Sequence, residues 1–303
     1  MKKILLCFSL TVCLLSAVTI DELVKNTNEN NYDLKSIDKS IEVANHQISL
    51  SKKWQNPTLS LGLNDLWLND LSSRDKEAMQ ASFIGLSQVI PTGSKLEIKE
   101  KIAQKDRNIQ ILNLEDKKLE LESKVYEYVY TILLLEKKYN LLESYEQNIK
   151  KLEALFTSLY KYQKVTQNEI LNSQISALDI GLQKQNLKNM IDNSYLKLEQ
   201  ITYTKIDKID ENIDIKKINL LTINQEHPKF KTLEEMANKS KNMADLEAEK
   251  KIPDLMLNVA YFQRDSKFND YVNVSVSFPL PIYDTENTAR LQAKMNMNET
   301  NDR

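Results

Sequence analysis

The chain has 303 residues, of which 28% are charged and 41% hydrophobic, and its formal net charge is −2. This balance predicts a folded protein, and the lack of a basic excess argues against nucleic-acid binding. The chain contains only four glycines and no proline between Pro91 and Pro228, which favours long helices.

The N-terminus has the pattern of a secretory signal peptide. Two lysines precede the apolar run Ile4–Leu15, which is too short to cross a bilayer as a helix, and two small residues follow it. We therefore expect residues 1–17 to be a signal peptide. Cys7 and Cys13 both lie within it, so a processed chain would contain neither a disulfide nor a reactive thiol.

Residues 21–55 are predicted to form one helix, because apolar residues recur there at helical spacing as far as Pro57. The period then changes to two. Residues 57–68 and 79–90 alternate apolar with polar or small side chains, as in the leucines at positions 59, 61 and 63. Each segment therefore predicts a strand with one apolar face and one polar face.

From Ser94 to about Tyr162 the pattern is helical without interruption, which predicts a rod about 100 Å long. An apolar heptad stripe with one polar position, Glu146, runs along this helix. The stripe consists of Val125, Tyr128, Ile132, Leu135, Tyr139, Leu142, Ile149, Leu152, Phe156 and Leu159. Further leucines flank it, so the helix is expected to pack against more than one neighbour. They are Leu133, Leu134, Leu141 and Leu155.

A second helix is predicted from about Gln167 to Tyr203, antiparallel to the first. Its apolar residues hold one heptad phase at the start and another later, which indicates a stutter. The first group is Leu171, Ile175, Leu178 and Leu182, and the second is Leu187, Ile191, Leu198 and Ile201. Residues 205–225 are expected to form a variable connector.

The last part of the chain repeats the first. Residues 226–257 align with residues 30–61 without a gap, and each copy has a helix, a proline and then an alternating strand. The strands predicted in the second copy are 254–263 and 270–281. The apolar face predicted for the last strand comprises Tyr271, Val272, Val274, Val276 and Phe278.

Each of the four predicted strands has about 10–12 residues, the length that a tilted strand needs to cross a bilayer. Four strands cannot close a barrel, and open sheet edges are not stable in lipid, so several chains would have to combine their strands. Aromatic residues lie near the strand ends, where interfacial girdles are expected. They are Trp54, Trp67, Tyr261, Phe262, Tyr271 and Tyr283. The alternative is a small soluble sheet packed on a helix.

With these features, the chain after residue 17 resembles the TolC-like outer-membrane efflux family over nearly all of its length. The resemblance lies in Asn56–Leu61, in Gly85–Pro91 before the long helix, and in the repeat pair Ile252–Leu255 and Val276–Asp284. The segment Leu159–Leu171, between the two long helices, also resembles the family, although the glycine common in that turn is absent.

This resemblance implies a mainly α-helical fold with short β-strands. A long antiparallel helical hairpin would form a periplasmic tunnel wall, and four transmembrane strands would be contributed to a shared oligomeric barrel. The family implies a trimer in the outer membrane that works with a periplasmic adaptor protein and an inner-membrane pump. Its role would be passive export of small solutes. The run Phe278–Asp284 is similar to the heavy-metal (cation) efflux branch, which would add metal cations as cargo.

The expected organisation follows from the resemblance and the repeat. A signal peptide at 1–17 would precede a first repeat at 18–204, the connector at 205–225 and a second repeat at 226–303. Family members carry a second helical hairpin that the last segment is too short to contain, so the second repeat is expected to be incomplete.

No catalytic or cofactor-binding constellation is visible, so we expect neither an enzyme nor a cofactor. His46 and His227 are far apart, and Met295 and Met297 lie in a polar terminus, so no metal site is expected. The candidate partner-binding site is the hairpin tip, since loops at the end of a rigid scaffold often bind partners. It comprises Tyr162, Gln163, Lys164, Val165, Thr166, Gln167 and Asn168. The alternative for this segment is an ordinary exposed turn.

Two other hypotheses stay open at this point. A periplasmic adaptor or a structural coiled-coil protein would also have a signal peptide and a helical hairpin. Adaptors flank their hairpin with Gly-rich strands, which are not seen here. A truncated, non-functional fragment is the other possibility.

Overall fold

The computed structural model describes residues 18–70, 74–213, 226–283 and 285–301. The predicted signal peptide and residues 214–225 of the predicted connector lie outside the described residues. The chain divides into two compact units, residues 1–36 with 116–223 and residues 37–115 with 224–303. The 66-residue helix α3 (Lys95–Tyr160) contributes to both units.

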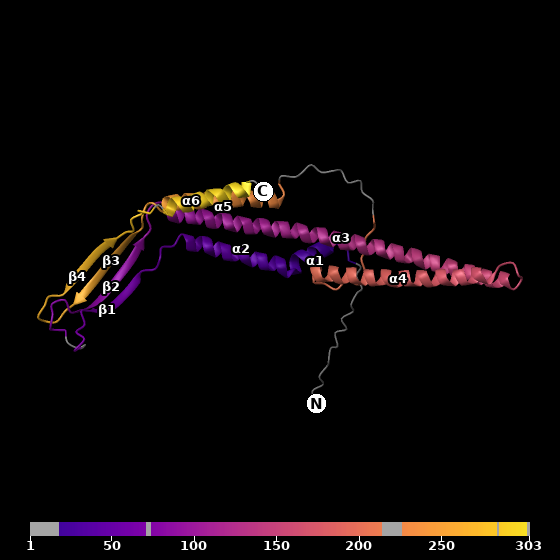
Figure 1. Ribbon diagram of the computed structural model, residues 1–303, viewed down its shortest axis with the longest axis horizontal. Helices are drawn as coiled ribbons and strands as arrows, with labels where there is room; N and C mark the ends of the chain where they lie inside the picture. Colours follow the sequence, from indigo (N-terminus) through magenta and orange to yellow (C-terminus); the bar gives the residue numbers. More distant parts are fainter. Residues whose placement is uncertain (1–17, 71–73, 214–225, 284, 302–303) are drawn as a thin grey trace, which may run out of the picture. The chain divides into compact units, whose positions relative to one another are not determined.

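The first unit is built on an antiparallel hairpin of α3 and α4 (Gln167–Thr202), which is visible in Figure 1. Helix α1 (Ile20–Asn30) packs against the base of this hairpin, where the buried apolar core lies. The core residues are Ile20, Leu23, Val125, Val129, Ile132, Leu133, Leu198, Ile206 and Ile209. Burial of such side chains is the main stabilising contribution at the base.

The single helix predicted at 21–55 is wrong, because the chain forms α1 and then α2 (Tyr32–Ser51) with a break at Asn31. Asn31 has an extended backbone, and its side-chain oxygen accepts hydrogen bonds from the amides of Asp33 (2.9 Å) and Leu34 (3.4 Å). Its side-chain nitrogen donates to the carbonyl of Ile201 at 3.1 Å. Asn31 therefore starts a new helix and ties it to the end of α4, as an N-cap residue can.

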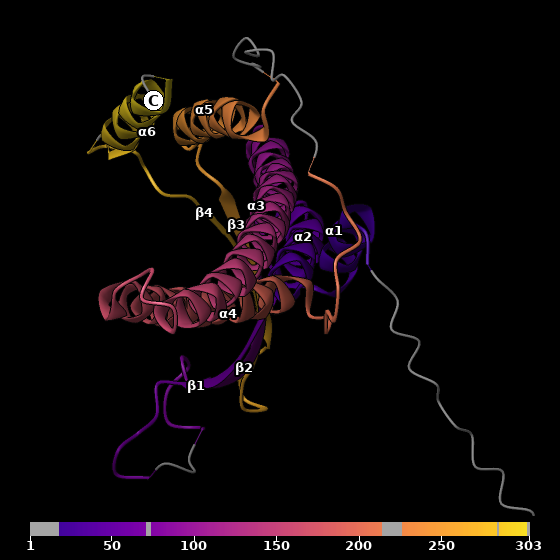
Figure 2. The same ribbon diagram turned by 90° about the vertical axis from the view of Figure 1, so that its right-hand side faces the viewer.

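The second unit contains a four-stranded antiparallel sheet in the order β1–β2–β3–β4. The strands are β1 (Thr58–Asn64), β2 (Ala81–Ile90), β3 (Leu255–Gln263) and β4 (Tyr271–Ser277). Helices α5 (Pro228–Glu249) and α6 (Thr285–Asn301) pack side by side in this unit, as Figures 1 and 2 show. The order helix, strand, strand, helix occurs once in α2–β1–β2–α3 and again in α5–β3–β4–α6.

The two edge strands are shorter than predicted, with seven residues each in β1 and β4. Strand β1 ends at Asn64 because Asp65 adopts a left-handed conformation, with φ +51°. The side chain of Gln80 holds the following loop by donating to the Asp65 carbonyl at 3.1 Å. Pro279 and Pro281 follow β4 closely, and proline has no amide hydrogen with which to extend a ladder.

The turn from β2 into α3 is fastened to the start of β3. The Asp254 carboxylate accepts hydrogen bonds from the Thr92 amide at 3.0 Å and from the Lys95 ammonium at 2.6 Å. The Thr92 hydroxyl donates to the Pro253 carbonyl at 2.6 Å. Gly93, with φ +65°, provides the left-handed residue that this turn requires. These contacts join the end of the first strand pair to the start of the second.

Within the described residues, none of the helices combines the length and the apolar character needed to cross a membrane.

Candidate functional site

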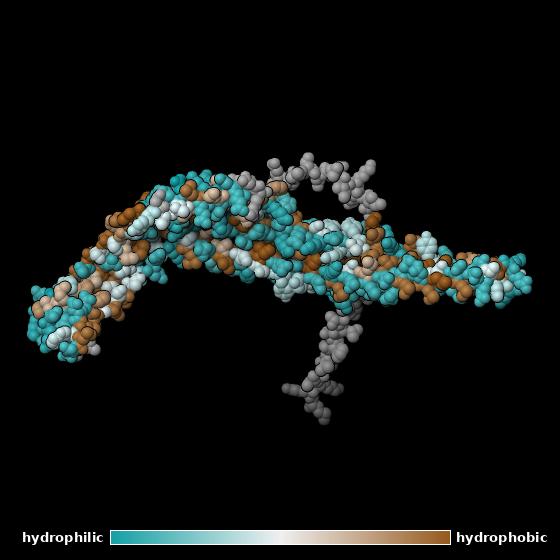
Figure 3. All heavy atoms as spheres, in the orientation of Figure 1, coloured by the Kyte–Doolittle hydropathy of each residue, from teal (hydrophilic) through white to brown (hydrophobic). Residues whose placement is uncertain are grey.

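The first candidate site is the sheet, one face of which is apolar and exposed. Residues paired across all four strands, such as Leu61, Ile84, Tyr261 and Val272, lie in one row on this face. Its exposed members are Leu59, Leu61, Leu63, Ile84, Leu86, Val259, Tyr261, Val272, Val274 and Val276. Figure 3 shows hydrophobic residues at the surface of the sheet. A continuous apolar face of this kind needs a nonpolar partner, which can be lipid or protein.

The opposite face of the sheet is more polar, although it also holds Ala81, Val89, Met256 and Ala260, and it carries one aromatic row. Phe262 stacks on Phe83 with ring centroids 5.3 Å apart and on Tyr271 at 4.8 Å. Gly62 is the β1 neighbour of Phe83, and a Cβ atom there would lie 2.5 Å from the Phe83 ring. Tyr271 was predicted on the apolar face of β4, and this is wrong. Tyr271 alternates with Val272 and pairs with Phe262, so it belongs to the polar face.

The second candidate site is the seam between α3 and α4, where the predicted stutter is wrong. One set of buried and half-buried residues keeps a single heptad phase along the whole of α4, so no phase change occurs. They are Ile170, Ser173, Ala177, Ile180, Lys184, Leu187, Ile191, Ser194, Leu198 and Ile201. A second group of residues, the leucine stripe (Leu171, Ile175, Leu178 and Leu182), is exposed. The single phase could have been found in the sequence, because the heptad positions of Leu187 and Ile191 continue back to Ile180. Small and polar residues at the other seam positions concealed it.

Polar contacts replace apolar packing in the part of the seam away from the base. Lys184 lies 2.8 Å from the Glu146 carboxylate and 3.8 Å from that of Glu143, and its ammonium lies 5.1 Å from the centre of the Tyr139 ring. Hydrogen bonds from Lys150 and Lys184 lower the pKa of the Glu146 carboxyl from 4.5 to about 2. Glu146, predicted as a polar gap in the stripe, is therefore the acceptor in a charged cluster between the helices.

Two further polar pairs cross the same seam. Gln174 donates to Glu153 at 2.8 Å, and the Tyr195 hydroxyl donates to Glu136 at 3.0 Å. Burial, together with the neighbouring Glu136 charge, raises the pKa of the Tyr195 phenol above its usual value. Leu152, predicted in the stripe, is exposed, and Glu153 occupies the seam position in its place.

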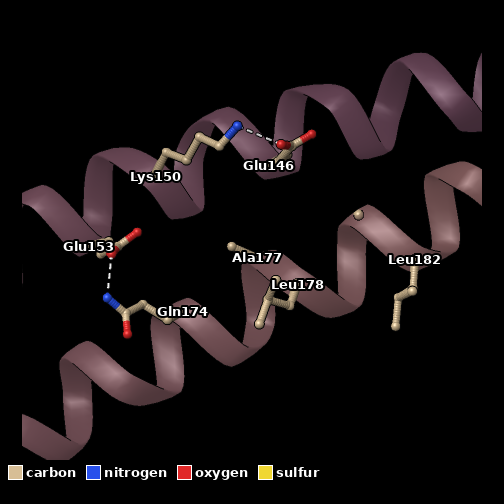
Figure 4. Close-up of a pocket in the computed structure, with 8 residues that line it drawn as sticks. Glu146, Lys150, Glu153, Gln174, Ala177, Leu178 and Leu182 are labelled. Atoms are coloured by element: carbon tan, nitrogen blue, oxygen red, sulfur yellow. Dashed lines mark hydrogen bonds and ion pairs between the residues drawn. The ribbon is translucent and has the colours of Figure 1, made fainter.

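A groove of ≈ 780 Å³ runs beside this polar part of the seam. Glu146, Lys150 and Glu153 line it from α3. The lining residues from α4 are Gln174, Ala177, Leu178, Gly181 and Leu182. In Figure 4, Ala177 is directed toward α3, whereas the side chains of Leu178 and Leu182 point away from it. The groove is thus polar toward α3 and apolar along its α4 rim.

The third candidate site is the hairpin tip, predicted at Tyr162–Asn168. Helix α3 ends in a Schellman motif, in which the amide of Lys164 donates to the Leu159 carbonyl at 3.1 Å and that of Gln163 to the Tyr160 carbonyl at 2.9 Å. Gln163 takes the left-handed position, with φ +57°, that glycine usually occupies. The predicted tip is therefore a compact turn, built without glycine.

Helix α4 begins at the other end of the tip with a capping box. The Thr166 amide donates to the Glu169 carboxylate at 2.9 Å, and the Thr166 hydroxyl donates to the same group. Tyr162, between the two caps, has 73% of its surface exposed. The seven predicted residues thus lie together at one end of the hairpin, fixed on both sides by helix caps.

The residues considered for metal binding do not come together. In the parts of the chain that the structure describes, no cluster of three or more His, Cys, Asp or Glu residues could hold an ion. His227 caps α5, since its Nδ1 atom accepts a hydrogen bond from the Lys229 amide at 3.2 Å, and His46 is exposed on α2. Met295 is exposed on α6.

The fold agrees with solved outer-membrane channels. The chain superimposes on the CmeC outer membrane channel of Campylobacter jejuni with a TM-score of 0.74 and 17% identity, over 93% of this chain and 66% of that one. For VceC of Vibrio cholerae the TM-score is 0.73 with 10% identity, over 93% and 73% of the two chains. For the open MtrE channel of Neisseria gonorrhoeae it is 0.69 with 12% identity, over 93% and 68%. At these identities the likeness defines the fold, and the chain spans about two thirds of the length of these channels.

A profile of the outer membrane efflux protein family matches residues 23–202, which is more than half of the chain. No curated protein sequence matches the chain significantly. The chain belongs to the outer membrane efflux protein family. The predicted family and the predicted fold class of long helices with a small four-stranded sheet are thus confirmed. Membership places the chain in the outer membrane, with a periplasmic extension.

Proposed function

We propose that the chain is a subunit of an outer-membrane export channel that works in a tripartite efflux system. It would act as a passive conduit for small solutes or metal cations, with the energy supplied by a pump elsewhere. The observation that carries this proposal is the sheet, whose apolar face is exposed along all four strands and whose other face is more polar. Lipid suits the first face and a water-filled lumen suits the second.

The edges of the sheet support an oligomer. Within the described residues, β1 and β4 each pair with one strand only, so each presents a row of unpaired backbone groups. Lipid does not tolerate such edges, whereas strands of neighbouring subunits would pair with them and close a barrel. We propose a trimer, the assembly that the family resemblance implies, with the α3–α4 hairpin as part of the periplasmic tunnel wall.

The tip is the proposed contact with a periplasmic adaptor, which would in turn connect to an inner-membrane pump. Tyr162–Asn168 is short, exposed and held at both ends by helix caps, so a partner could bind it with little loss of conformational entropy. The cation branch of the family remains a prediction from Phe278–Asp284. No described cluster of metal ligands adds support for it.

The test is to express the full chain and separate outer membrane, inner membrane and soluble periplasm. We expect an outer-membrane species whose gel mobility changes on heating, and stepwise conductance after transfer to planar bilayers. A folded monomer that stays in the soluble periplasm without detergent would support an adaptor or structural coiled-coil protein and would overturn the channel. A chain that inserts but never conducts would be a non-functional fragment.

A matched pair of variants tests the two faces of β4. Val274→Lys places a charge on the apolar face, and Ser275→Lys places the same charge on the polar face one residue further on. A lysine facing lipid near the bilayer centre costs about 2–4 kcal/mol, whereas a lumen-facing charge is tolerated. We expect Val274→Lys to reduce the heat-modifiable species and Ser275→Lys to keep it. Equal effects would contradict the assignment of the faces.

A further inference from the structure

The loop that joins β1 to β2 begins with an apolar segment, which consists of Leu66, Trp67 and Leu68. Their side chains are exposed, with 45%, 44% and 88% of the residue surface accessible. It is the one place in the described parts of the chain where three consecutive large apolar residues are exposed. A strand exposes only alternate residues on one face, so strand geometry does not account for this run. An exposed apolar run of this kind indicates a binding surface.

Polar contacts hold both ends of the apolar segment in place. Asp65, directly before it, has φ +51°, and its carbonyl accepts a hydrogen bond from the side chain of the buried Gln80 at 3.1 Å. After the segment, the Asp70 amide donates to the Trp67 carbonyl at 3.0 Å. The segment therefore protrudes from a fixed base, and a partner could bind it with little loss of conformational entropy.

The second half of the same loop is bonded to the loop between β3 and β4. Arg264 of that loop donates to the Ala78 carbonyl at 3.1 Å, and the Lys267 ammonium lies 3.0 Å from the Asp75 carboxylate. Both loops lie at the end of the sheet away from the helices of this unit (Figure 1). The β1–β2 loop thus has a polar half that is tied to its neighbour and an apolar half that is exposed.

The position of the apolar segment favours lipid as its partner. Leu63 is the last β1 residue of the exposed apolar face of the sheet, and the segment begins three residues later. The protein lies in the outer membrane, so lipid is available at this face. Tryptophan favours the boundary between headgroups and hydrocarbon. The polar pairs on either side of the segment, Asn64–Asp65 and Asn69–Asp70, can remain in water.

The segment differs from an aromatic girdle on the strands of a barrel. Strand β1 ends at Asn64, and the left-handed Asp65 breaks the alternation of faces before Trp67 is reached. Girdle residues belong to the strands themselves, whereas this segment takes no part in the pairing of β1 with β2. Its apolar side chains can therefore be changed without altering the sheet.

We propose that Leu66, Trp67 and Leu68 insert into the outer leaflet of the outer membrane beside the barrel and anchor the β1–β2 loop to lipid. The site recognises the boundary between headgroups and acyl chains rather than one lipid species. The inference rests on the proposed channel, in which the apolar face of the sheet contacts lipid. It adds a lipid-binding site that lies outside the strands.

The fluorescence of Trp67 tests this anchor. The chain contains two tryptophans, so Trp54→Phe leaves Trp67 as the only one. After reconstitution into phosphatidylcholine vesicles, Trp67 should lose emission when the lipid carries bromine near the headgroup end of its acyl chains. It should lose less when the bromine lies at the bilayer centre, and iodide in the water should quench it little.

A control moves the tryptophan to the other loop, by adding Trp67→Phe and Ser266→Trp to the same chain. Position 266 is exposed in the polar loop between β3 and β4. Iodide should quench this tryptophan, and brominated lipid should not.

A second pair of variants tests the role of the two leucines. Leu66→Ser together with Leu68→Ser should weaken the quenching by brominated lipid and shift the Trp67 emission to longer wavelength. Met79→Ser is the matched control, because Met79 is 62% exposed in the same loop but lies outside the apolar segment. It should leave the quenching unchanged. Both variants should keep the heat-modifiable species, since none of these residues belongs to a strand.

Three outcomes would overturn the proposal. If iodide quenches Trp67 and brominated lipid does not, the segment lies in water. If neither quenches it, the segment is covered by protein, such as the same segment of another copy at the mouth of the pore. If the double serine variant is quenched by brominated lipid as strongly as the parent, the leucines do not anchor the loop. A conducting, heat-modifiable protein with any of these results would refute the anchor alone, whereas loss of the heat-modifiable species in the Trp54→Phe chain and its parent would refute the channel as well.

Discussion

The base of the α3–α4 hairpin and the part beyond it use the same two helices with opposite chemistry. At the base, Val125, Val129, Ile132 and Leu198 are fully buried among α1, α3 and α4. From residue 134 to residue 197, all of it within the described part of the chain, no apolar side chain is buried. Polar pairs such as Lys184 with Glu146 hold that part together instead.

This difference shows which part of the hairpin buries its apolar side chains within a single chain. The base has its own core, so its stability follows from burial within the unit. The outer part leaves apolar residues on both helices at the surface and compensates with charged contacts that solvent weakens. The base is therefore expected to be stable in the monomer, whereas the outer part is expected to depend on neighbouring helices.

The largest expected effect comes from removing a core side chain at the base. Leu198→Ala should lower the free energy of unfolding by about 2–5 kcal/mol, because it leaves a cavity among fully buried residues. Leu196→Ala is the matched control, since Leu196 lies two residues away on α4 and is 55% exposed. Its effect should stay within about 0.5 kcal/mol. Urea unfolding followed by circular dichroism gives the free energy of unfolding of both variants. Equal losses of this free energy would contradict the assignment of position 198 to the core and position 196 to the solvated surface.

The next prediction compares a glutamine-to-glycine substitution at the tip with the same substitution within α4. Their effects on stability should have opposite signs. Gln163→Gly should stabilise the hairpin by up to about 1 kcal/mol, because glycine adopts the left-handed conformation at φ +57° without strain. Gln185→Gly should destabilise it by about 1 kcal/mol, since Gln185 is exposed in the middle of α4. Thermal unfolding of the two variants measures both shifts. A loss of stability in Gln163→Gly would mean that the tip does not adopt this turn.

The sequence predicted this hairpin and the sheet well, because both depend on strong local signals. The change from period 3.6 to period two located the strands, and the run without glycine or proline located α3 within one residue of its start. The tip was located for the same reason. Its turn geometry was not, since Gln163 occupies a position where glycine is the usual signal.

The sequence failed where tertiary contacts decide between two locally plausible arrangements. The leucine stripe suggested a stutter because the prediction used the spacing of apolar residues alone. The side of α4 that faces α3 is instead determined by contacts of Lys184, Glu146 and their neighbours. Asn31 was read as part of a helix because its bond to the Ile201 carbonyl joins residues 170 positions apart. No pattern in a single sequence identifies such pairs.

A smaller effect is expected from Lys184→Ala in the polar seam. The substitution removes the contact between the helices but leaves Glu146 paired with Lys150, which lies 2.6 Å away on α3. We expect a lower free energy of unfolding, by less than the Leu198→Ala loss. Lys188→Ala, on an exposed side of the same helix, should have no measurable effect. If Lys184→Ala cost as much as Leu198→Ala, the two parts of the hairpin would not differ in the way described.

The smallest effect is a pH dependence that belongs to the outer part of the hairpin. Hydrogen bonds from Lys150 and then Lys184 hold the pKa of Glu146 at about 2, below its ordinary 4.5. A carboxyl whose pKa is lower in the folded state contributes stability above its unfolded pKa and loses it as the pH falls through the folded value. The melting temperature should therefore fall between pH 4.5 and about 2, and Glu146→Gln should reduce that fall.

Glu120 serves as the control, because its pKa is about 2 as well, set by Lys124 and Lys117 on its own helix. Glu120→Gln should change the melting profile to a similar extent, but only Glu146→Gln should remove the pH dependence of the distance between spin labels at positions 153 and 174, because Glu146, unlike Glu120, bonds to the opposite helix.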